Sequence, residues 1–97
     1  MSLSEIQTKN QRRAMLKLLS KMPDLSSSDF ELREAVNDVE KINTSFDKFK
    51  SECAWLEEQG LVKIEGQVID TIKLTQRGLD VAEYKVAFPG IAKKRPS

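Results

Sequence analysis

The segment from residue 44 to residue 51 concentrates side chains that can hydrogen-bond to base edges in DNA. Lysine donates to O6 and N7 of guanine, serine and threonine bond to several bases, and aspartate accepts from N4 of cytosine. The residues of these types are Thr44, Ser45, Asp47, Lys48, Lys50 and Ser51. On the exposed side of a helix they would form a surface that enters the major groove.

A second set of polar side chains suits contacts with phosphates. A cation that neutralises a phosphate adds affinity and salt dependence but carries no sequence information. The candidates lie near the N-terminus, around a predicted turn and at the C-terminus: Arg12, Arg13, Lys63, Gln67, Lys73, Lys93, Lys94 and Arg95. The alternative roles are solvated surface charge and, for the two lysines beside the turn, protection of a strand edge.

The hydrophobic spacing predicts the first two helices that would hold these residues. A first helix is expected over residues 4–21 and ends before Pro23, because proline disfavours helical backbone at the preceding residue. Residues 24–27 are expected to form a loop. Ser28 then caps a second helix, with Glu31 at the position that completes a capping box. The apolar side of this second helix is Phe30, Leu32, Ala35, Val36 and Val39.

The third predicted helix, residues 44–59, has the most regular periodicity in the chain. Its apolar residues recur at spacings of three and four and form one stripe: Phe46, Phe49, Cys53 and Leu56. Thr44 or Asn43 can cap it, and Asp47 favours Thr44 because an acid stabilises the first turn. Gly60 is expected to end the helix in the left-handed conformation.

Next come two β-prone runs, residues 61–64 and 68–74. Because only a short turn separates them, they predict a β-hairpin. Thr75 caps a short last helix over residues 76–84. This order predicts an α+β, mainly α, winged helix-turn-helix domain over residues 1–88. Residues 89–97 are expected to form a flexible basic tail, frayed from Ile91 onward. An unrelated small α+β domain is the alternative.

Two motifs carry a resemblance to a known group of proteins. The stretches WLEEQGLV at residues 55–62 and LTQRGLDVA at residues 74–82 resemble the signature of bacterial winged-helix regulators. With the Pro-Gly pair at 89–90 and the basic ending, the chain resembles small winged-helix proteins of Mu-like prophages, filed as ArsR-type transcriptional regulators. The resemblance implies the fold and a regulatory role on DNA. It does not imply metal sensing, because Cys53 stands alone and the chain has no histidine.

The charge distribution supports a nucleic-acid partner only in part, since the net charge is +1. Residues 1–22 hold five cations and one acid, whereas residues 23–40 hold six acids and one cation. The last thirteen residues hold four cations and no acid. The helix predicted over residues 44–59 carries two lysines against four acids, which is unfavourable for binding DNA.

Catalysis is not expected from this composition. Without histidine the chain lacks the commonest general base and metal ligand, and it has no glycine-rich phosphate loop. We therefore expect no enzyme activity, no cofactor, no metal and no small-molecule ligand. The single cysteine and the absence of an apolar run of about 20 residues predict a cytoplasmic protein that does not cross a membrane.

The sequence thus predicts a phage-type transcriptional regulator that binds double-stranded DNA, reading the major groove with the helix at residues 44–59. A homodimer is expected, joined through the first helix or through the last helix with Phe88 and Ile91. The alternative is a winged-helix protein-interaction module with no DNA role. Trp55 lies opposite the apolar stripe, so we expect it to pack against the hairpin or the C-terminal segment, unless it anchors a partner.

Overall fold

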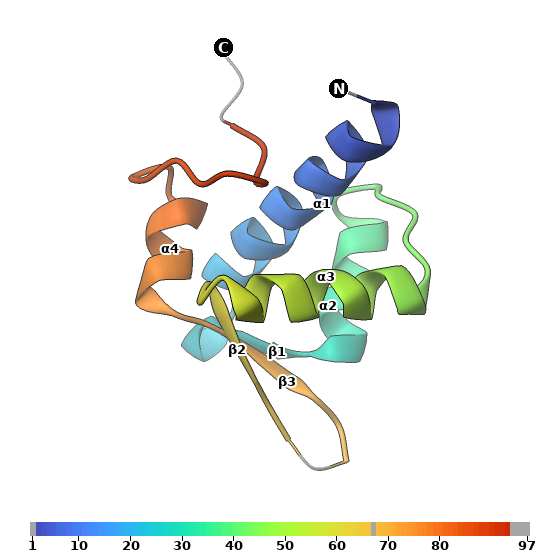
Figure 1. The fold of residues 1–97 in the computed structure, drawn as a ribbon. Helices are drawn as coiled ribbons and strands as arrows, with labels where there is room; N and C mark the ends of the chain where they lie inside the picture. The colour runs from blue at the N-terminus through green and yellow to red at the C-terminus, as the bar shows by residue number, and fades with distance from the viewer. Residues whose placement is uncertain (1, 67, 94–97) are drawn as a thin grey trace.

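The computed structural model describes residues 2–66 and 68–93. Within these ranges the chain forms a mainly helical α+β domain, as predicted at that level. Its elements are α1 (Leu3–Ser20), the 3₁₀ helix η1 (Pro23–Leu25), β1 (Ser26–Ser28), α2 (Asp29–Asp38), α3 (Phe46–Glu58), β2 (Val62–Glu65), β3 (Thr71–Leu74) and α4 (Gln76–Ala82). The β2–β3 hairpin projects away from the helices, whereas the first turn of α1 lies at the other end of the molecule (Figure 1). Among the described helices, none is both long and apolar enough to span a bilayer.

The sheet has three antiparallel strands in the order β1-β3-β2, so the prediction of a two-stranded hairpin alone is wrong. The loop predicted over residues 24–27 contains a strand, which pairs Ser26 with Lys73 and Ser28 with Thr71. Asp24 and Leu25 both have a φ of 56°, and this left-handed backbone turns the chain from α1 toward the edge of β3. Three consecutive serines give no alternation of apolar and polar residues, so this strand has no pattern of its own.

The hairpin is shorter than predicted. Its second strand begins at Thr71, and Val68 and Ile69 lie in the connecting loop with 96% and 61% of their surface exposed. Gly66 is required in this loop because its φ is +129° and a Cβ there would lie 2.1 Å from the carbonyl oxygen of Ile69. Gln67, a predicted phosphate contact, lies outside the described residues.

The core lies between the inner face of the sheet and the four helices. Most of the apolar positions predicted for the third helix are confirmed, since Phe49, Cys53 and Leu56 are buried. The fully buried side chains are Met15, Leu16, Leu19, Leu32, Val36, Phe49, Cys53, Leu56, Leu61, Ile72 and Val81. Three predicted core residues are instead exposed by 44% to 64%, because they stand at helix ends beyond the core contact: Phe30, Val39 and Phe46.

The predicted caps Ser28 and Thr75 are confirmed, although the return bond of the Glu31 side chain that would complete a capping box is not found among the described contacts, and the cap of α3 differs from the prediction. Ser28 accepts a hydrogen bond from the Glu31 amide at 3.2 Å, and Thr75 accepts one from the Gly78 amide at 3.0 Å. The cap of α3 is Ser45, not Thr44 or Asn43, and it accepts from the Lys48 amide at 3.1 Å. The predicted left-handed Gly60 is confirmed, with a φ of +75°.

The C-terminal segment folds back onto α1, which corrects the expectation that the chain frays from Ile91. Ile91 is 4% exposed, and the Ala92 amide donates to the Lys9 carbonyl at 3.2 Å. Burial of the apolar Ile91 side chain beside α1 holds this segment in place, although its composition is mostly basic. Lys94 and Arg95, both predicted DNA contacts, lie outside the described residues.

Candidate nucleic-acid interface

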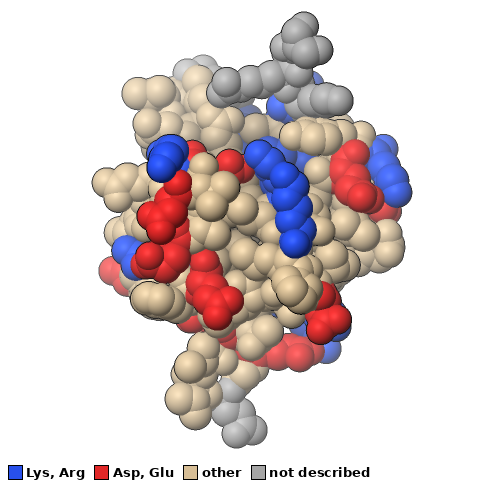
Figure 2. All heavy atoms as spheres, turned by 180° about the vertical axis from the view of Figure 1, so that it is seen from behind, with Lys and Arg blue, Asp and Glu red and all other residues tan. Residues whose placement is uncertain are grey.

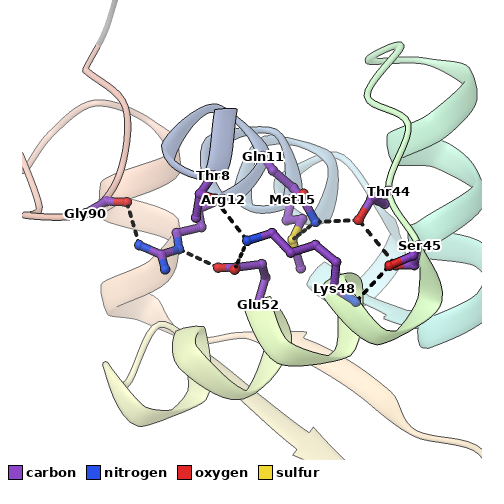
Figure 3. Close-up of polar contacts among 9 residues, drawn as sticks. All are labelled: Thr8, Gln11, Arg12, Met15, Thr44, Ser45, Lys48, Glu52 and Gly90. Carbon is purple, nitrogen blue, oxygen red and sulfur yellow. Dashed lines mark hydrogen bonds and ion pairs between the residues drawn. The ribbon is translucent and has the colours of Figure 1, made fainter. Parts of the chain in front are cut away.

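The two lysines of α3 that were predicted to contact bases both face acidic side chains of the chain itself. Lys48 Nζ lies 2.9 Å from Glu52 Oε2 and 3.0 Å from the Thr8 hydroxyl (Figure 3). Lys50 Nζ lies 3.3 Å from Asp29 Oδ2 and also bonds Asp70. In the unbound protein the positive charge of α3 is therefore already neutralised.

The Lys50 cluster fixes the hairpin against the helices. The hydrogen bond to Asp70 raises the pKa of Lys50, and the hydrogen bond to Asp29 adds to the rise although partial burial opposes it. The Asp29 amide also donates to the Asp70 carbonyl at 3.0 Å. One ammonium group thus joins α3, the start of α2 and the loop end of the hairpin, and two carboxylates around it leave a net negative charge.

Glu52 is the centre of a second polar cluster, drawn in Figure 3, between α1, α3 and the C-terminal segment. It is 4% exposed, and its carboxylate accepts from Arg12 Nε at 2.5 Å as well as from Lys48. Arg12 also donates to the Gly90 carbonyl at 3.1 Å, and its guanidinium lies 3.7 Å from the centre of the Trp55 ring. Arg12 was predicted to contact phosphate, but here it holds three parts of the fold together.

Arg13, also a predicted phosphate contact, is engaged in the same way. Its Nε donates to the Ala92 carbonyl at 2.8 Å, its Nη1 donates to the Val81 carbonyl, and its guanidinium lies 4.4 Å from the Tyr84 ring centre. Burial lowers its pKa, although the charge interaction with Tyr84 acts in the opposite direction. The packing of Trp55 against the C-terminal segment is confirmed by an edge-to-face contact with Phe88 at 6.3 Å.

The remaining candidates of α3 offer little positive charge. Thr44 is 4% exposed and accepts from Gln11 Nε2 at 3.2 Å, so it is not on the surface. Ser45 caps the helix, and Asp47 and Ser51 are exposed. Since Glu57 and Glu58 are exposed as well, the solvent-facing surface of α3 is predominantly acidic.

The outer face of the sheet brings two of the candidate lysines together. Lys63 and Lys73 are direct register partners on β2 and β3, and Ser26 is the partner of Lys73 on β1. All of these side chains point away from the core, since their strand neighbours Val62, Ile72 and Leu74 are buried. We call this surface the wing face and define it as Lys63, Lys73, Ser26, Thr71 and Glu65, the last being the register partner of Thr71.

The wing-face lysines are poorly compensated. Lys63 makes one ion pair with Glu65 at 3.1 Å, with the two side chains 68% and 56% exposed, and such exposed pairs contribute little. Lys73 makes no ion pair or hydrogen bond within the described residues. Like charges directly opposite each other destabilise a sheet unless an anion lies between them. The arrangement therefore suits a phosphate group.

Elsewhere the cations do not merge into one basic surface. Figure 2 shows, from behind the view of Figure 1, acidic side chains gathered along one side and separate lysine or arginine side chains. The basic face predicted for the first helix is interrupted because Lys17 pairs with Glu40 at 3.1 Å. Lys93 is exposed beside the first turns of α1.

Sequence reasoning missed the acids that neutralise α3. Asp29, Glu52 and Asp70 lie 4 to 21 positions from the lysines that they bond, and only Glu52, four residues after Lys48, has a spacing visible in the sequence. In the described part of the chain no group of three or more potential metal ligands occurs. Comparison with known proteins finds no matching family model, no matching curated protein and no matching solved structure.

Proposed function

We propose that this chain is a winged helix-turn-helix protein that binds double-stranded DNA and regulates transcription in the cytoplasm of a phage-infected bacterium. The observation that carries the proposal is the facing pair Lys63 and Lys73 on the exposed wing face. The hairpin that bears them projects from the helices, so a duplex can reach it without any rearrangement of the helices (Figure 1).

The wing face contacts the phosphate backbone rather than base edges. The hydroxyl of Ser26, the register partner of Lys73, can donate to a phosphate that Lys73 binds, whereas Thr71 is paired in register with Glu65. Neutralising two phosphates gives a slope of log K against log salt of about −2. Binding of this kind positions the protein on DNA with little sequence preference.

The two lysines of α3 make different contributions. Lys48 has 44% of its side chain exposed, so its ammonium group can turn from the buried Glu52 carboxylate toward a phosphate. Glu52 would then keep its bond to Arg12. Lys50 is bound to two aspartates and holds the hairpin in place, so its role is to orient the wing face.

Fluorescence anisotropy with a labelled duplex of about 30 base pairs, at about 50 and 200 mM salt, tests this proposal. We expect Lys63→Ala/Lys73→Ala to weaken binding by about tenfold or more at the lower salt and to reduce the salt slope by about two. The matched control is Lys21→Ala/Lys41→Ala, which removes the same charge from exposed positions elsewhere. Equal effects of the two double variants, or no binding by the folded wild type at low salt, would refute the proposal.

A protein-interaction module is the second candidate, and one observation favours it. The acidic surface of α3 adjoins exposed apolar side chains at the start of α2 and in the hairpin loop, among them Phe30 and Ile69. Exposed apolar side chains bordered by charge are typical of protein interfaces. The same anisotropy titration separates the candidates, because a module without a DNA role gives no salt-dependent signal with any variant.

A further inference from the structure

The first of two surfaces with complementary chemistry is a groove between α1 and the C-terminal segment. Its volume is about 850 Å³, and its lining includes Ile6, Lys9, Phe88, Pro89, Ile91 and Lys93. Ile6 is 41% exposed, so the groove offers apolar surface to a partner. Among the described residues that line it, two are lysines and none is acidic. We call it the C-terminal groove.

The second surface surrounds the Lys50 cluster. Phe30 follows Asp29 in the chain, Ile69 precedes Asp70, and the Phe46 ring centre lies 5.8 Å from Lys50 Nζ. These three apolar side chains are 61%, 61% and 44% exposed. We call them the Phe30 face.

The Phe30 face is bordered by negative charge. The two aspartates of the cluster outnumber its single lysine, and exposed Glu31, Glu34 and Asp47 lie within the first two turns of α2 and α3. The other cations described on these turns are Arg33, which lies over the Phe46 ring at 5.9 Å, and Lys48, which is paired with Glu52. An apolar surface with acidic borders selects a partner that is apolar and basic.

We propose that the Phe30 face of one molecule binds in the C-terminal groove of a second copy of this chain, giving head-to-tail association. The groove supplies the apolar floor and the lysines, and the Phe30 face supplies the protruding apolar side chains and the acidic border. A symmetric contact would instead place lysines against lysines or carboxylates against carboxylates, and like charges oppose such a contact. The pairing is therefore heterologous, and it can continue from one molecule to the next.

The positions of the two surfaces permit this arrangement. The start of α2 lies beside the loop end of β3, at the opposite end of the molecule from the first turn of α1 and the C-terminal segment (Figure 1). A molecule bound through one surface therefore leaves its other surface accessible. This inference does not depend on DNA binding.

Both surfaces are held rigid before they meet. The Lys50 ion pairs fix the start of α2 and the loop end of the hairpin. Arg12 and Arg13 donate to the carbonyls of Gly90 and Ala92 and so fix the wall of the groove. Association between preformed surfaces loses little conformational entropy, which favours binding.

Sedimentation velocity of the full chain without DNA tests the proposal, at concentrations from about 5 to about 500 µM, where interfaces of modest affinity associate. We expect the weight-average sedimentation coefficient to rise with concentration and to fall with added salt. Phe30→Ser disables the Phe30 face, and Ile6→Ser/Lys93→Glu disables the groove; each should weaken self-association by about tenfold or more. Val39→Ser is the matched control, because Val39 is also on α2 and is 64% exposed.

An equimolar mixture of the two disabled variants gives the decisive result. Each contributes one intact surface, so the mixture should form one-to-one dimers with wild-type affinity and no larger species. A wild type that stays monomeric throughout would overturn the proposal, as would a mixture that does not dimerise. Equal losses in Phe30→Ser and Val39→Ser, or undiminished dimers of either disabled variant alone, would also overturn it. Circular dichroism of each variant checks that these exposed substitutions leave the fold intact.

Discussion

Replacing Glu52 with alanine removes the carboxylate that joins α1, α3 and the C-terminal segment. The Glu52 side chain is 5% exposed and that of its principal partner, Arg12, is 15% exposed, so the pair is largely shielded from water. After the substitution Arg12 keeps the Gly90 carbonyl and the Trp55 ring, but its charge has no counterion. Lys48 loses a partner as well, but it can turn into solvent.

The size of the effect follows from this difference in burial. Removing one member of a buried ion pair costs about 3 to 5 kcal/mol, mostly because the remaining charge stays desolvated. Because Arg12 keeps its other contacts, we expect Glu52→Ala to lower the free energy of unfolding by about 3 kcal/mol, the lower end of this range. For a domain of this size the melting temperature should fall by about 12 to 24 °C. Lys48→Ala should cost less than about 1 kcal/mol, since the Lys48 side chain is 44% exposed.

Urea unfolding followed by circular dichroism measures these free energies, and a double-mutant cycle apportions them. We expect a large coupling between Arg12 and Glu52 and a small one between Lys48 and Glu52. The apolar double variant Arg12→Met/Glu52→Leu should recover much of the lost stability, because it leaves no unpaired buried charge. If Glu52→Ala lowers the free energy of unfolding by less than about 1 kcal/mol, this cluster does not hold the three segments together. The same conclusion follows if Lys48→Ala costs more than Glu52→Ala.

Three further predictions concern single positions. Gly78→Ala should lower the free energy of unfolding by about 2 kcal/mol or more in urea titrations, because the added Cβ would lie 2.0 Å from the Leu61 carbonyl oxygen. Burial raises the pKa of Cys53 to about 12, whereas the thiol of the unfolded chain ionises near 8.5. Stability should therefore fall between about pH 9 and 12 by about 1.4 kcal/mol per unit, and Cys53→Ala should remove this part of the slope. Lys50→Ala should speed hydrogen exchange at the Asp29 amide, and unchanged exchange would contradict its role in fixing the loop end of the hairpin.

Local patterns in the sequence were sufficient for most of the helical framework. The spacing of Phe49, Cys53 and Leu56 identified the buried side of α3, and Gly60 and Thr75 marked the ends of neighbouring elements. These features act within one or two helical turns, so each carries its own signal. The same periodicity overestimated burial at helix ends, where Phe46 belongs to the stripe but lies beyond the contact with the core.

Features that depend on distant partners were not predictable in this way. β1 is a strand because β3 offers it an edge, and nothing within its three serines indicates pairing. The choice of Ser45 over Thr44 as the α3 cap has a similar origin, because the Thr44 hydroxyl is already bonded to Gln11 from α1. Both residues suit a cap by type, so only the tertiary contact decides between them.

The location of the candidate DNA contact changes for the same reason. The positions of Lys and Arg in the sequence predicted a basic first helix and two base-reading lysines in the third. A cation is available to a phosphate, however, only if no carboxylate or carbonyl of its own fold binds it more favourably. Helices bring side chains from several directions together, and Arg12, Arg13 and Lys50 each find such partners. Among the described residues, Lys73 on the outer face of the sheet has no ion pair or hydrogen bond, and its register partners are Lys63 and Ser26. A candidate cation that the described fold leaves uncompensated is therefore found on the hairpin, and the proposal of DNA binding rests on that position.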